Sequence, residues 1–452
     1  MDSVYYYCVS SVMWFRRDLR VNDHPALLVA GESGPVYPLF VFDPVLWDSA
    51  GPVRATYLLN SLASLNESLG GNLVFRVGDP AVVVPEFARE VSATSVHVSA
   101  DYGPYGRLRD QQVSDSLHVP LVATGSPYAI APGRVRKGDD TPYRVFTPFY
   151  RAWFAHGWRA PVIGDIPKFA SADSDELPSA GLLEFELPKA GEAAALERLT
   201  LFRDKILSGY PDSRDHADLD GTSALSHHLK YGEIHPRTVL AEIGPTDEVF
   251  RKEICWREFY ADVLFHNPRS ARESLDARFD SVMPWASGAK ADNLFDAWTQ
   301  GKTGFPFVDA GMRQLNTTGW MHNRVRMVTA SFLVKDLHIN WHRGATYFMS
   351  QLRDGDLASN SHGWQWTAGC GTDASPFFRV FNPITQGLKF DPAGEYVRRY
   401  VPELAHLPGK TIHTPWEGLR GYENGYPEPI VDHKVEREVA LADYALMKGQ
   451  PR

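Results

Sequence analysis

The first 125 residues alternate short apolar runs with amphipathic stretches, and this alternation constrains the fold more than any other feature of the chain. Because strands that alternate with helices pair in parallel and are covered on both faces, the pattern predicts a doubly wound parallel α/β sheet. We expect strands at 9–15, 36–42, 73–77, 95–99 and 121–124, with helices at 54–69, 80–91 and 107–117 between them. Ligands of such sheets bind beyond the carboxyl ends of the strands.

The pattern changes twice along the 452 residues, a length that favours two or three domains. Residues 127–194 are rich in Pro, Gly, Ser and Asp, which is typical of an irregular surface connector. From 195 onward helical spacing dominates, with stops predicted at Gly232, Pro268, Pro284, Gly319 and Gly344. The sequence thus predicts an α/β domain over 1–126, a connector over 127–194 and a large all-α domain over 195–452.

Composition restricts the compartment and the kinds of site. No apolar run is long enough to cross a bilayer, and the opening Met1-Asp2-Ser3 lacks the features of a secretory signal, so we expect a cytoplasmic protein without a membrane partner. The three cysteines, Cys8, Cys255 and Cys370, lie far apart. This spacing argues against a zinc or iron–sulfur site, and no metal is expected.

The net charge of −9 disfavours a nucleic-acid partner, because phosphate neutralisation supplies most non-specific binding energy. Many Arg and Lys residues nevertheless fall among aromatic residues between Arg313 and Arg399. They indicate either a local basic face on an acidic protein or an ordinary solvated helical surface.

A predicted helix over 250–265 carries an unusual polar stripe. Four side chains follow the spacing i, i+3, i+4, i+7 and share one face: Glu253, Trp256, Arg257 and Tyr260. A carboxylate, an indole and a guanidinium on one stripe indicate the wall of a polar aromatic pocket. The alternative is an ion pair covered by a tryptophan.

Further polar groups follow in the second half of the chain. Asn323, Arg326 and Met327 share a helical face, whereas His322 lacks a second metal-type residue at i+4 and is interpreted as a structural hydrogen-bonding histidine. Residues 354–360 place two acids and an amide on a loop that enters a helix. Twelve tryptophans, three of them at 341, 364 and 366, could fill a core, stack on bases or donate electrons.

Several segments together resemble the photolyase/cryptochrome family, over essentially the whole chain. The matching stretches are 14–20 with 22–23, 220–223, 256–260, 305–310 and 354–383. Within the family the chain is most similar to class I photolyases for cyclobutane pyrimidine dimers.

The resemblance implies a U-shaped FAD in the helical domain. Positions that match the family's phosphate and backbone contacts are Tyr210, Thr222, Ser223, Ala224, Leu225 and Ser226. Near the ribose and flavin it implies Asp354, Gly355, Asp356 and Asn360, with Arg326 paired to Asp354. Asn360 would face flavin N5, where an amide can hydrogen-bond but cannot deliver a proton as a carboxylic acid can. Plant-type cryptochromes carry an acid there, so Asn360 favours repair.

The resemblance also implies that excited reduced flavin gives an electron to a dimer flipped out of the DNA, opens its ring and takes the electron back. Positions that match the family's lesion cavity are Arg214, Glu253, Trp256, Asn323, Arg324, Met327, Trp366 and Gln386, and Arg257 and Tyr260 are added from the stripe. Glu253 would hydrogen-bond the thymine edge, and Trp256 and Trp366 would pack on its rings.

Photoreduction in the family uses a chain of tryptophans, and Trp364 and Trp341 match its first two members. An insertion after Pro284 obscures the third, for which Trp285 is the candidate. A second departure is Ser361-His362, where small or amide residues are common in the family.

An antenna pigment is implied for the first domain. The segment 101–109 resembles the deazaflavin-binding branch, so Arg54, Asp101 and Arg109 would contact an 8-hydroxy-5-deazaflavin. The alternatives are methenyltetrahydrofolate or no pigment. The expected function is a monomeric enzyme that repairs dimer-containing DNA with light, and the alternative is a cryptochrome-like blue-light receptor without repair activity.

Overall fold

The computed structural model describes residues 9–373 and 379–449. Its amino-terminal part contains a five-stranded parallel sheet with the strand order β3-β2-β1-β4-β5. The strands are β1 (Ser11–Phe15), β2 (Val36–Phe42), β3 (Val74–Val77), β4 (Ser95–Val98) and β5 (Leu121–Ala123). The predicted doubly wound sheet is confirmed, with all five strands where the sequence placed them.

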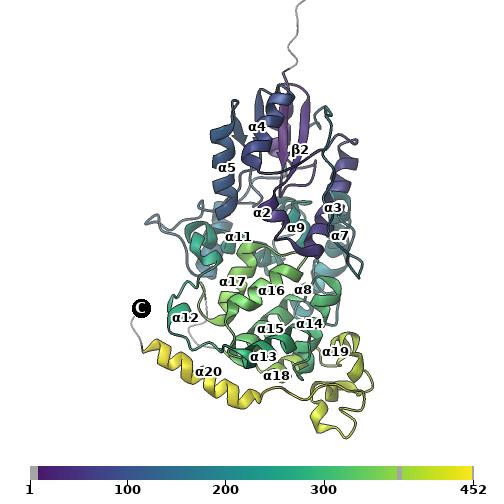
Figure 1. Cartoon of the computed structure of the whole chain (residues 1–452), viewed down its shortest axis with the longest axis vertical. Helices are drawn as coiled ribbons and strands as arrows, with labels where there is room; N and C mark the ends of the chain where they lie inside the picture. The colour runs from purple at the N-terminus through teal and green to yellow at the C-terminus, as the bar shows by residue number, and fades with distance from the viewer. Residues whose placement is uncertain (1–8, 374–378, 450–452) are drawn as a thin grey trace, which may run out of the picture.

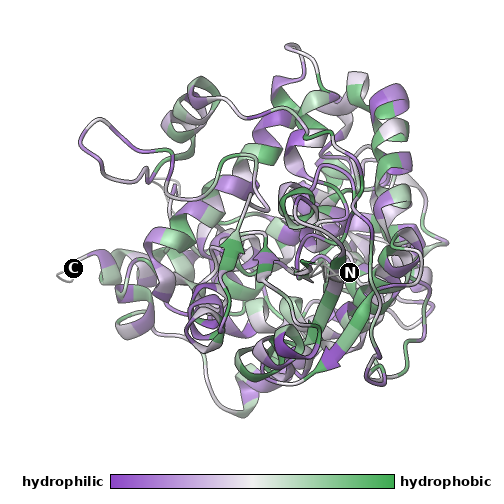
Figure 2. Ribbon diagram, turned by 90° about the horizontal axis from the view of Figure 1, so that it is seen from above, coloured by the Kyte–Doolittle hydropathy of each residue, from purple (hydrophilic) through white to green (hydrophobic). Residues whose placement is uncertain are grey.

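Alternate residues of β1 enter two different cores, as expected for a strand buried on both faces. Met13 and Phe15 pack on one side of the sheet, whereas Val12 and Trp14 pack on the other. Helices cover both sides, and in the view from above the strands are coloured as hydrophobic between them (Figure 2). The helices of this part are α1 (Pro25–Gly31), α2 (Pro44–Trp47), α3 (Gly51–Ser68), α4 (Pro80–Glu90) and α5 (Pro104–Ser116).

The predicted connector is not wholly irregular, because it contains α6 (Phe146–His156) and the first residues of α7 (Glu192–Leu201). The buried side chains of α6 follow helical spacing: Phe146, Phe149, Tyr150 and Trp153. They share a core with Phe259 of the helical part. The Pro and Gly content around α6 hid this pattern from the sequence analysis.

The rest of the chain is helical, as predicted, and lies below the sheet in Figure 1. Its α-helices are α8 (Tyr210–Ser213), α9 (Ser226–Tyr231), α10 (Pro236–Ala241), α11 (Glu248–His266), α12 (Arg278–Ser281), α13 (Ala289–Thr299), α14 (Pro306–Thr318), α15 (Asn323–Lys335), α16 (Trp341–Gln351), α17 (Leu357–Ala368), α18 (Pro383–Phe390), α19 (Glu395–Tyr400) and α20 (His433–Lys448). Short π and 3-10 turns are η1 (Phe202–Ile206), η2 (Leu207–Gly209), η3 (Pro268–Ala271), η4 (Pro402–Leu404), η5 (Gly409–His413) and η6 (Pro415–Glu417).

Four of the five predicted helix stops fall at or between helices, but the stop at Gly344 is wrong. Gly232 and Gly319 end α9 and α14 in the left-handed conformation, with φ of 69° and 65°. Gly344 instead lies inside α16. A Cβ there would meet the Trp364 ring at 2.1 Å, so this glycine permits α16 and α17 to approach closely.

The two parts meet at the carboxyl ends of the strands. Arg17, two residues after β1, donates to Asp356 at the start of α17, and their Nη2 and Oδ2 atoms are 2.8 Å apart. The sheet edge where a ligand was expected therefore lies against the loop that ends at Asp356, the N-cap of α17. None of the helices in the described ranges is long and apolar enough to span a membrane.

Candidate active site

Helix α11 has the half-buried polar face that the sequence predicted. The four side chains of the stripe are all half-buried: Glu253, Trp256, Arg257 and Tyr260. Between them Ile254, Cys255 and Phe259 are buried in the core. The helix thus separates a packed side from a side that is open enough to be part of a site.

Glu253 forms an ion pair with Arg214, which follows α8. Its Oε1 lies 2.8 Å from Nη1 of Arg214. Burial raises the pKa of Glu253 above its ordinary value, and the nearby guanidinium of Arg214 opposes that rise. The ion pair thus holds the carboxylate of Glu253 on the half-buried face of α11.

Trp256 and Arg257 are both held by contacts with segments outside α11. The Trp256 ring stacks on Phe146 of α6, with centroids 3.7 Å apart and planes 7° apart. Arg257 donates to the carbonyl oxygens of Pro127 and Leu229, at 3.1 and 3.2 Å. The guanidinium of Arg257 is therefore directed at the backbone on two sides.

Helix α15 contributes the second predicted stripe, with Asn323 exposed and Arg326 and Met327 half-buried, and Arg324 is half-buried beside it. Arg324 pairs with Asp215 at 2.8 Å, next to Arg214. His322 caps α15 by accepting from the amide of Arg324, and its burial lowers its pKa to about 4. The prediction of a structural histidine is confirmed.

The predicted pairing of Arg326 with Asp354 is also confirmed, with Nη2 and Oδ2 2.8 Å apart. Arg326 Nε donates to the carbonyl oxygen of Met321, while no described residue bonds its Nη1. Asp356 caps α17 by accepting from the amide of Ser359 at 3.0 Å. The loop with Gly355 is thus held at both of its acids.

Asn360 lies one helical turn after this cap and faces α16. Its Nδ2 donates to the carbonyl oxygen of Ala345 at 3.0 Å. None of the described residues bonds its Oδ1. The amide orientation is fixed by this bond, and its carbonyl oxygen remains free to accept from a ligand.

The segment over 222–226 forms a half-buried polar loop before α9. Arg198 binds its carbonyl oxygens, that of Thr222 at 2.7 Å and that of Ser223 at 2.8 Å. Ala224 has a φ of 50°, Leu225 is buried, and the side chain of Ser226 is exposed. Tyr210, buried at the start of α8, lies 5.7 Å from Phe202 between ring centroids.

Two of the three predicted tryptophans are buried in the helical core, and Trp285 is half-buried against it. The indole of Trp341 donates to Ser274 Oγ at 3.0 Å, and that of Trp285 to the carbonyl oxygen of Phe279 at 2.6 Å. The Trp364 ring contacts Trp298, with centroids 6.1 Å apart. Trp298 could not be predicted as part of this cluster, because nothing in its sequence spacing sets it apart.

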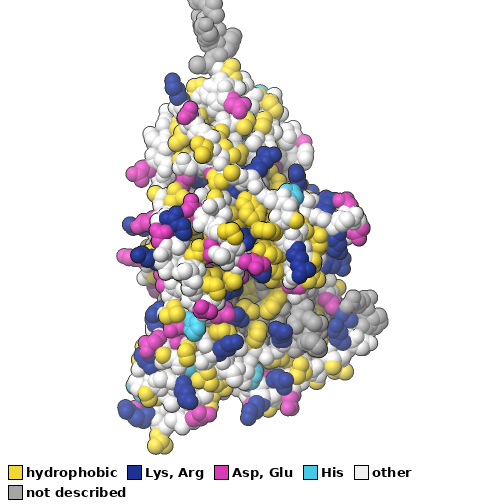
Figure 3. Space-filling model, turned by 180° about the vertical axis from the view of Figure 1, so that it is seen from behind, with side chains coloured by type: hydrophobic (Ala, Val, Ile, Leu, Met, Phe, Trp, Pro, Cys, Tyr) yellow, Lys and Arg dark blue, Asp and Glu magenta, His cyan; other side chains and the backbone are white. Residues whose placement is uncertain are grey.

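The remaining predicted lesion residues, Trp366 and Gln386, lie on α17 and α18. Trp366 is half-buried on α17, and Gln386 is half-buried on α18. On the face seen in Figure 3, hydrophobic side chains gather in a hollow at mid-height, and Lys and Arg side chains stand around it. Several of the arginines predicted to form a basic face between 313 and 399 are paired with acids, such as Arg313 with Glu403 at 2.7 Å.

The predicted antenna residues are only partly brought together. Arg109 pairs with Asp101 at 3.2 Å. Arg54 instead donates to the carbonyl oxygens of Met349 and Ser49. Two cations missed by the sequence analysis, Arg17 and Lys230, lie near both acids Asp101 and Asp356.

Lys230 stands out among these groups. Burial, with a smaller contribution from the nearby Arg17, lowers its pKa to about 7 against the opposing effect of Asp356. No described residue accepts a hydrogen bond from its ammonium group. Its position at the boundary of the two parts could not be predicted, because the polar residues of α9 look like those of any surface helix.

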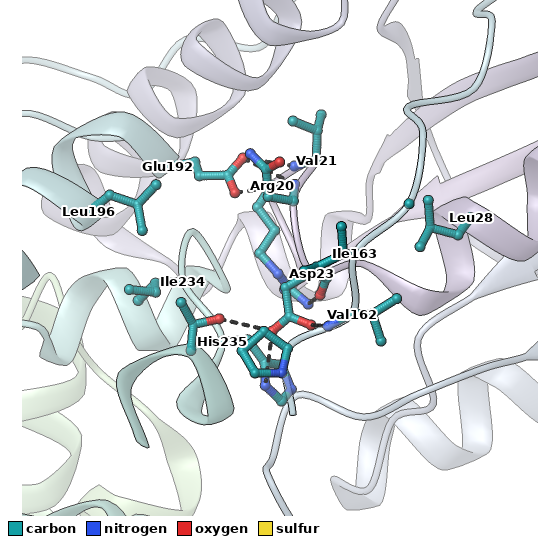
Figure 4. Close-up of a pocket in the computed structure, with 14 residues that line it drawn as sticks. Arg20, Val21, Asp23, Leu28, Val162, Ile163, Glu192, Leu196, Ile234 and His235 are labelled. Atoms are coloured by element: carbon teal, nitrogen blue, oxygen red, sulfur yellow. Dashed lines mark hydrogen bonds and ion pairs between the residues drawn. The ribbon is translucent and has the colours of Figure 1, made fainter. Parts of the chain in front are cut away.

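A separate pocket lies between the loop after β1, the connector and α10 (Figure 4). The carboxylate of Asp23 accepts from Arg237, Thr238 and the amide of Val162. Glu192 accepts from the amide of Val21 at 2.9 Å. Because these carboxylates are already bonded to protein donors, they fasten the two parts together, and none of the predicted site residues lines the pocket.

Comparison with known proteins identifies the family. Residues 250–446 match the FAD binding domain of DNA photolyase, and residues 11–167 match the DNA photolyase domain. The chain is 42% identical to a deoxyribodipyrimidine photo-lyase of Agrobacterium fabrum, over 97% of this chain and 98% of the relative.

Solved structures of similar proteins lead to the same family. A class III photolyase from Agrobacterium tumefaciens superposes with a TM-score of 0.90 at 39% identity, covering 99% of this chain and 100% of that one. A Synechocystis cryptochrome gives a TM-score of 0.87 at 28% identity, with 95% and 98% covered. The chain therefore belongs to the DNA photolyase family.

Proposed function

We propose that this protein binds reduced FAD and uses light to split cyclobutane pyrimidine dimers in DNA. The observation that carries the proposal is the orientation of Asn360, whose Nδ2 is bonded to Ala345 so that Oδ1 is left for the cofactor. An amide oxygen accepts from the N5–H of a reduced flavin and has no proton to deliver. This favours repair over the receptor function, for which the plant-type relatives carry an acid at that position.

The residues present fit FAD. Arg326 has an unbonded Nη1 beside the buried Asp354, and the loop over 222–226 turns its carbonyls toward Arg198. The hydroxyls of Thr222 and Ser226 and the ring of Tyr210 would hold the phosphates and the ribityl chain. Asp354, Gly355 and Asp356 would lie along the ribose and flavin. When bound and reduced, FAD supplies the photoexcited electron that opens the cyclobutane ring.

The polar face of α11 would receive the lesion. Glu253, held by its ion pair with Arg214, would hydrogen-bond the carbonyl and imide groups of the flipped thymines. Trp256 and Trp366 would pack on the unstacked rings. Arg214, Asn323, Arg324, Met327 and Gln386 would complete the cavity, with Arg257 and Tyr260 behind Trp256.

Two further assignments extend the proposal. Trp364, Trp341 and Trp285 would deliver electrons from the surface to an oxidised cofactor. An antenna pigment, with 8-hydroxy-5-deazaflavin as the first candidate and methenyltetrahydrofolate as the second, would bind near Asp101 and Arg109. Lys230, whose Nζ lies 5.7 Å from the centroid of the Tyr231 ring and near Asp101, would favour a pigment with an acceptor or a negative charge.

The class I assignment within the family is part of this proposal and rests on the motif resemblance, since the structural relative named above is a class III photolyase. The expectations of a cytoplasmic monomer that needs no metal stay predictions.

The proposal is tested by incubating the FAD-loaded, reduced protein with an oligonucleotide that contains one thymine dimer. Illumination in the near-ultraviolet to blue should restore thymines, and a dark sample should not. Asn360→Asp is the informative variant, because it changes only the group opposite N5. Equal, light-independent product in both samples, or none in either, would eliminate the proposed function.

A further inference from the structure

A row of aromatic rings runs behind the polar face of α11. Phe146 stacks on Trp256 at 3.7 Å, Trp256 contacts Tyr260 at 5.3 Å, and Tyr260 stacks on His362 at 5.7 Å, all between centroids. The first and last pairs are nearly parallel, with planes 7° and 20° apart. The row therefore joins three helices, α6, α11 and α17.

Both ends of the row are fixed. Phe146 is 6% exposed and packs on Phe259 as well, with centroids 5.8 Å apart. The ring of His362, 1% exposed, donates from Nδ1 to the carbonyl oxygen of Ala358 at 2.8 Å, and its Nε2 lies 3.0 Å from Ser270 Oγ. Rings held in this way cannot rotate without breaking a hydrogen bond or leaving the core.

This arrangement limits what Trp256 can do. With one face covered by Phe146, only the other face and the ring edge remain for a ligand, and the ring plane is set before any ligand arrives. A preset side chain loses little conformational entropy on binding, so it discriminates between ligands more sharply than a mobile one.

We infer that Phe146, Tyr260 and His362 are positioning residues that hold the Trp256 ring in the plane required by a pyrimidine dimer, and that they thereby set the preference for damaged over undamaged DNA. The inference rests on the proposed function. It gives a role to His362, which departs from the pattern of the family, and it places part of the lesion specificity in the connector helix α6.

The test compares the affinity for an oligonucleotide with one thymine dimer and for the same sequence without it, in the dark. Phe146→Leu removes the stacked ring and keeps an apolar side chain. The ratio of the two affinities should fall about 2- to 13-fold, which corresponds to the about 0.5–1.5 kcal/mol of an aromatic pair. Affinity for undamaged DNA and the bound FAD should stay unchanged.

Two matched variants separate positioning from general packing. Phe149→Leu makes the same change on the same helix, at a side chain that is 2% exposed and packs on Phe259 at 5.0 Å. It should lower the thermal midpoint without changing the affinity ratio. Phe146→Tyr keeps a stackable ring and should restore the ratio to within about 2-fold of the original protein.

His362→Leu applies the same test from the other end of the row, with a smaller loss because Tyr260 stands between it and Trp256. An unchanged affinity ratio in both Phe146→Leu and His362→Leu, with thermal losses like that of Phe149→Leu, would overturn the inference. If the unchanged protein itself shows no preference for the dimer, the proposed function fails and the positioning role fails with it.

Discussion

Replacing Arg17 with Gln removes an ion pair that joins the two parts of the molecule at Asp356, the N-cap of α17. Arg17 Nη2 lies 2.8 Å from Asp356 Oδ2, and the other oxygen of that carboxylate caps α17 at Ser359. The variant leaves Asp356 without its closest cation. We expect the first turn of α17, which carries Asn360, to open more often.

The free-energy cost of losing the Arg17–Asp356 ion pair can be estimated from the exposure of its two side chains. Hydrogen bonds to charged groups contribute about 1.5–3 kcal/mol. The two side chains are 29% and 12% exposed, and Arg257 and Lys230 remain near the carboxylate, so the lower half of that range applies. A cost of about 1.5–2 kcal/mol speeds amide exchange in α17 roughly 10- to 30-fold.

Hydrogen–deuterium exchange of peptides that cover 357–368 measures this directly. Asp356→Asn is the companion variant, because Asn caps helices as well as Asp does but carries no charge. In the double variant no unpaired charge remains, so part of the loss should be recovered. Arg203→Gln is the control, since its pair with Glu242 is 41% exposed on both sides and should leave α17 unaffected.

The pH dependence provides a second readout. Burial would raise the pKa of Asp356, but Arg17 and its neighbours hold it below the ordinary value, so its stabilising charge is present at neutral pH and is lost as pH falls. Arg17→Gln should shift this loss to higher pH. Unchanged amide exchange in α17, together with an unchanged loss of stability at low pH, would refute the reasoning.

Three further predictions concern single side chains. His362→Phe should make the protein less sensitive to acid, because burial holds the pKa of His362 at about 4 in the folded protein, against 6.5 in the unfolded chain. Between these pH values only the unfolded chain binds the proton, so the free energy of unfolding falls as pH drops. The thermal midpoint should therefore fall between pH 7 and pH 5 in the original protein, and this fall should be smaller in the variant. Trp364→Phe should abolish photoreduction, followed by absorption, yet spare repair by chemically reduced enzyme; photoreduction at the original rate would contradict the proposed electron path. Glu253→Ala should weaken dimer binding by about 1–3 kcal/mol while FAD remains bound, and loss of the flavin instead would show that Glu253 serves the cofactor.

Most of the fold could be predicted from local sequence patterns. The strands were predictable because each is a short apolar run buried on both sides, and α11 because its polar stripe follows helical spacing. Helix α6 was not predicted, because the Pro and Gly residues around it are typical of a loop and hid four apolar residues at helical spacing. Gly344 was misread as a stop because close packing against Trp364, which is a tertiary contact, decides its role.

The candidate site was predictable where pairing is local or carried by the family resemblance, as for Arg326 with Asp354. Contacts between distant segments were not. Phe146 stacks on Trp256 across 110 positions of sequence, and Arg17 pairs with Asp356 across 339 positions only because the two parts of the chain are packed together. No periodicity within either segment encodes such a contact.

The most direct test of a flavin held against a flipped lesion is the fluorescence lifetime of the reduced cofactor in the protein. An acceptor in contact with the flavin should shorten the lifetime when dimer-containing DNA is bound, whereas the same DNA without the dimer should leave it unchanged. Identical lifetimes with the two DNAs, under conditions where both are fully bound, would contradict electron transfer to the lesion.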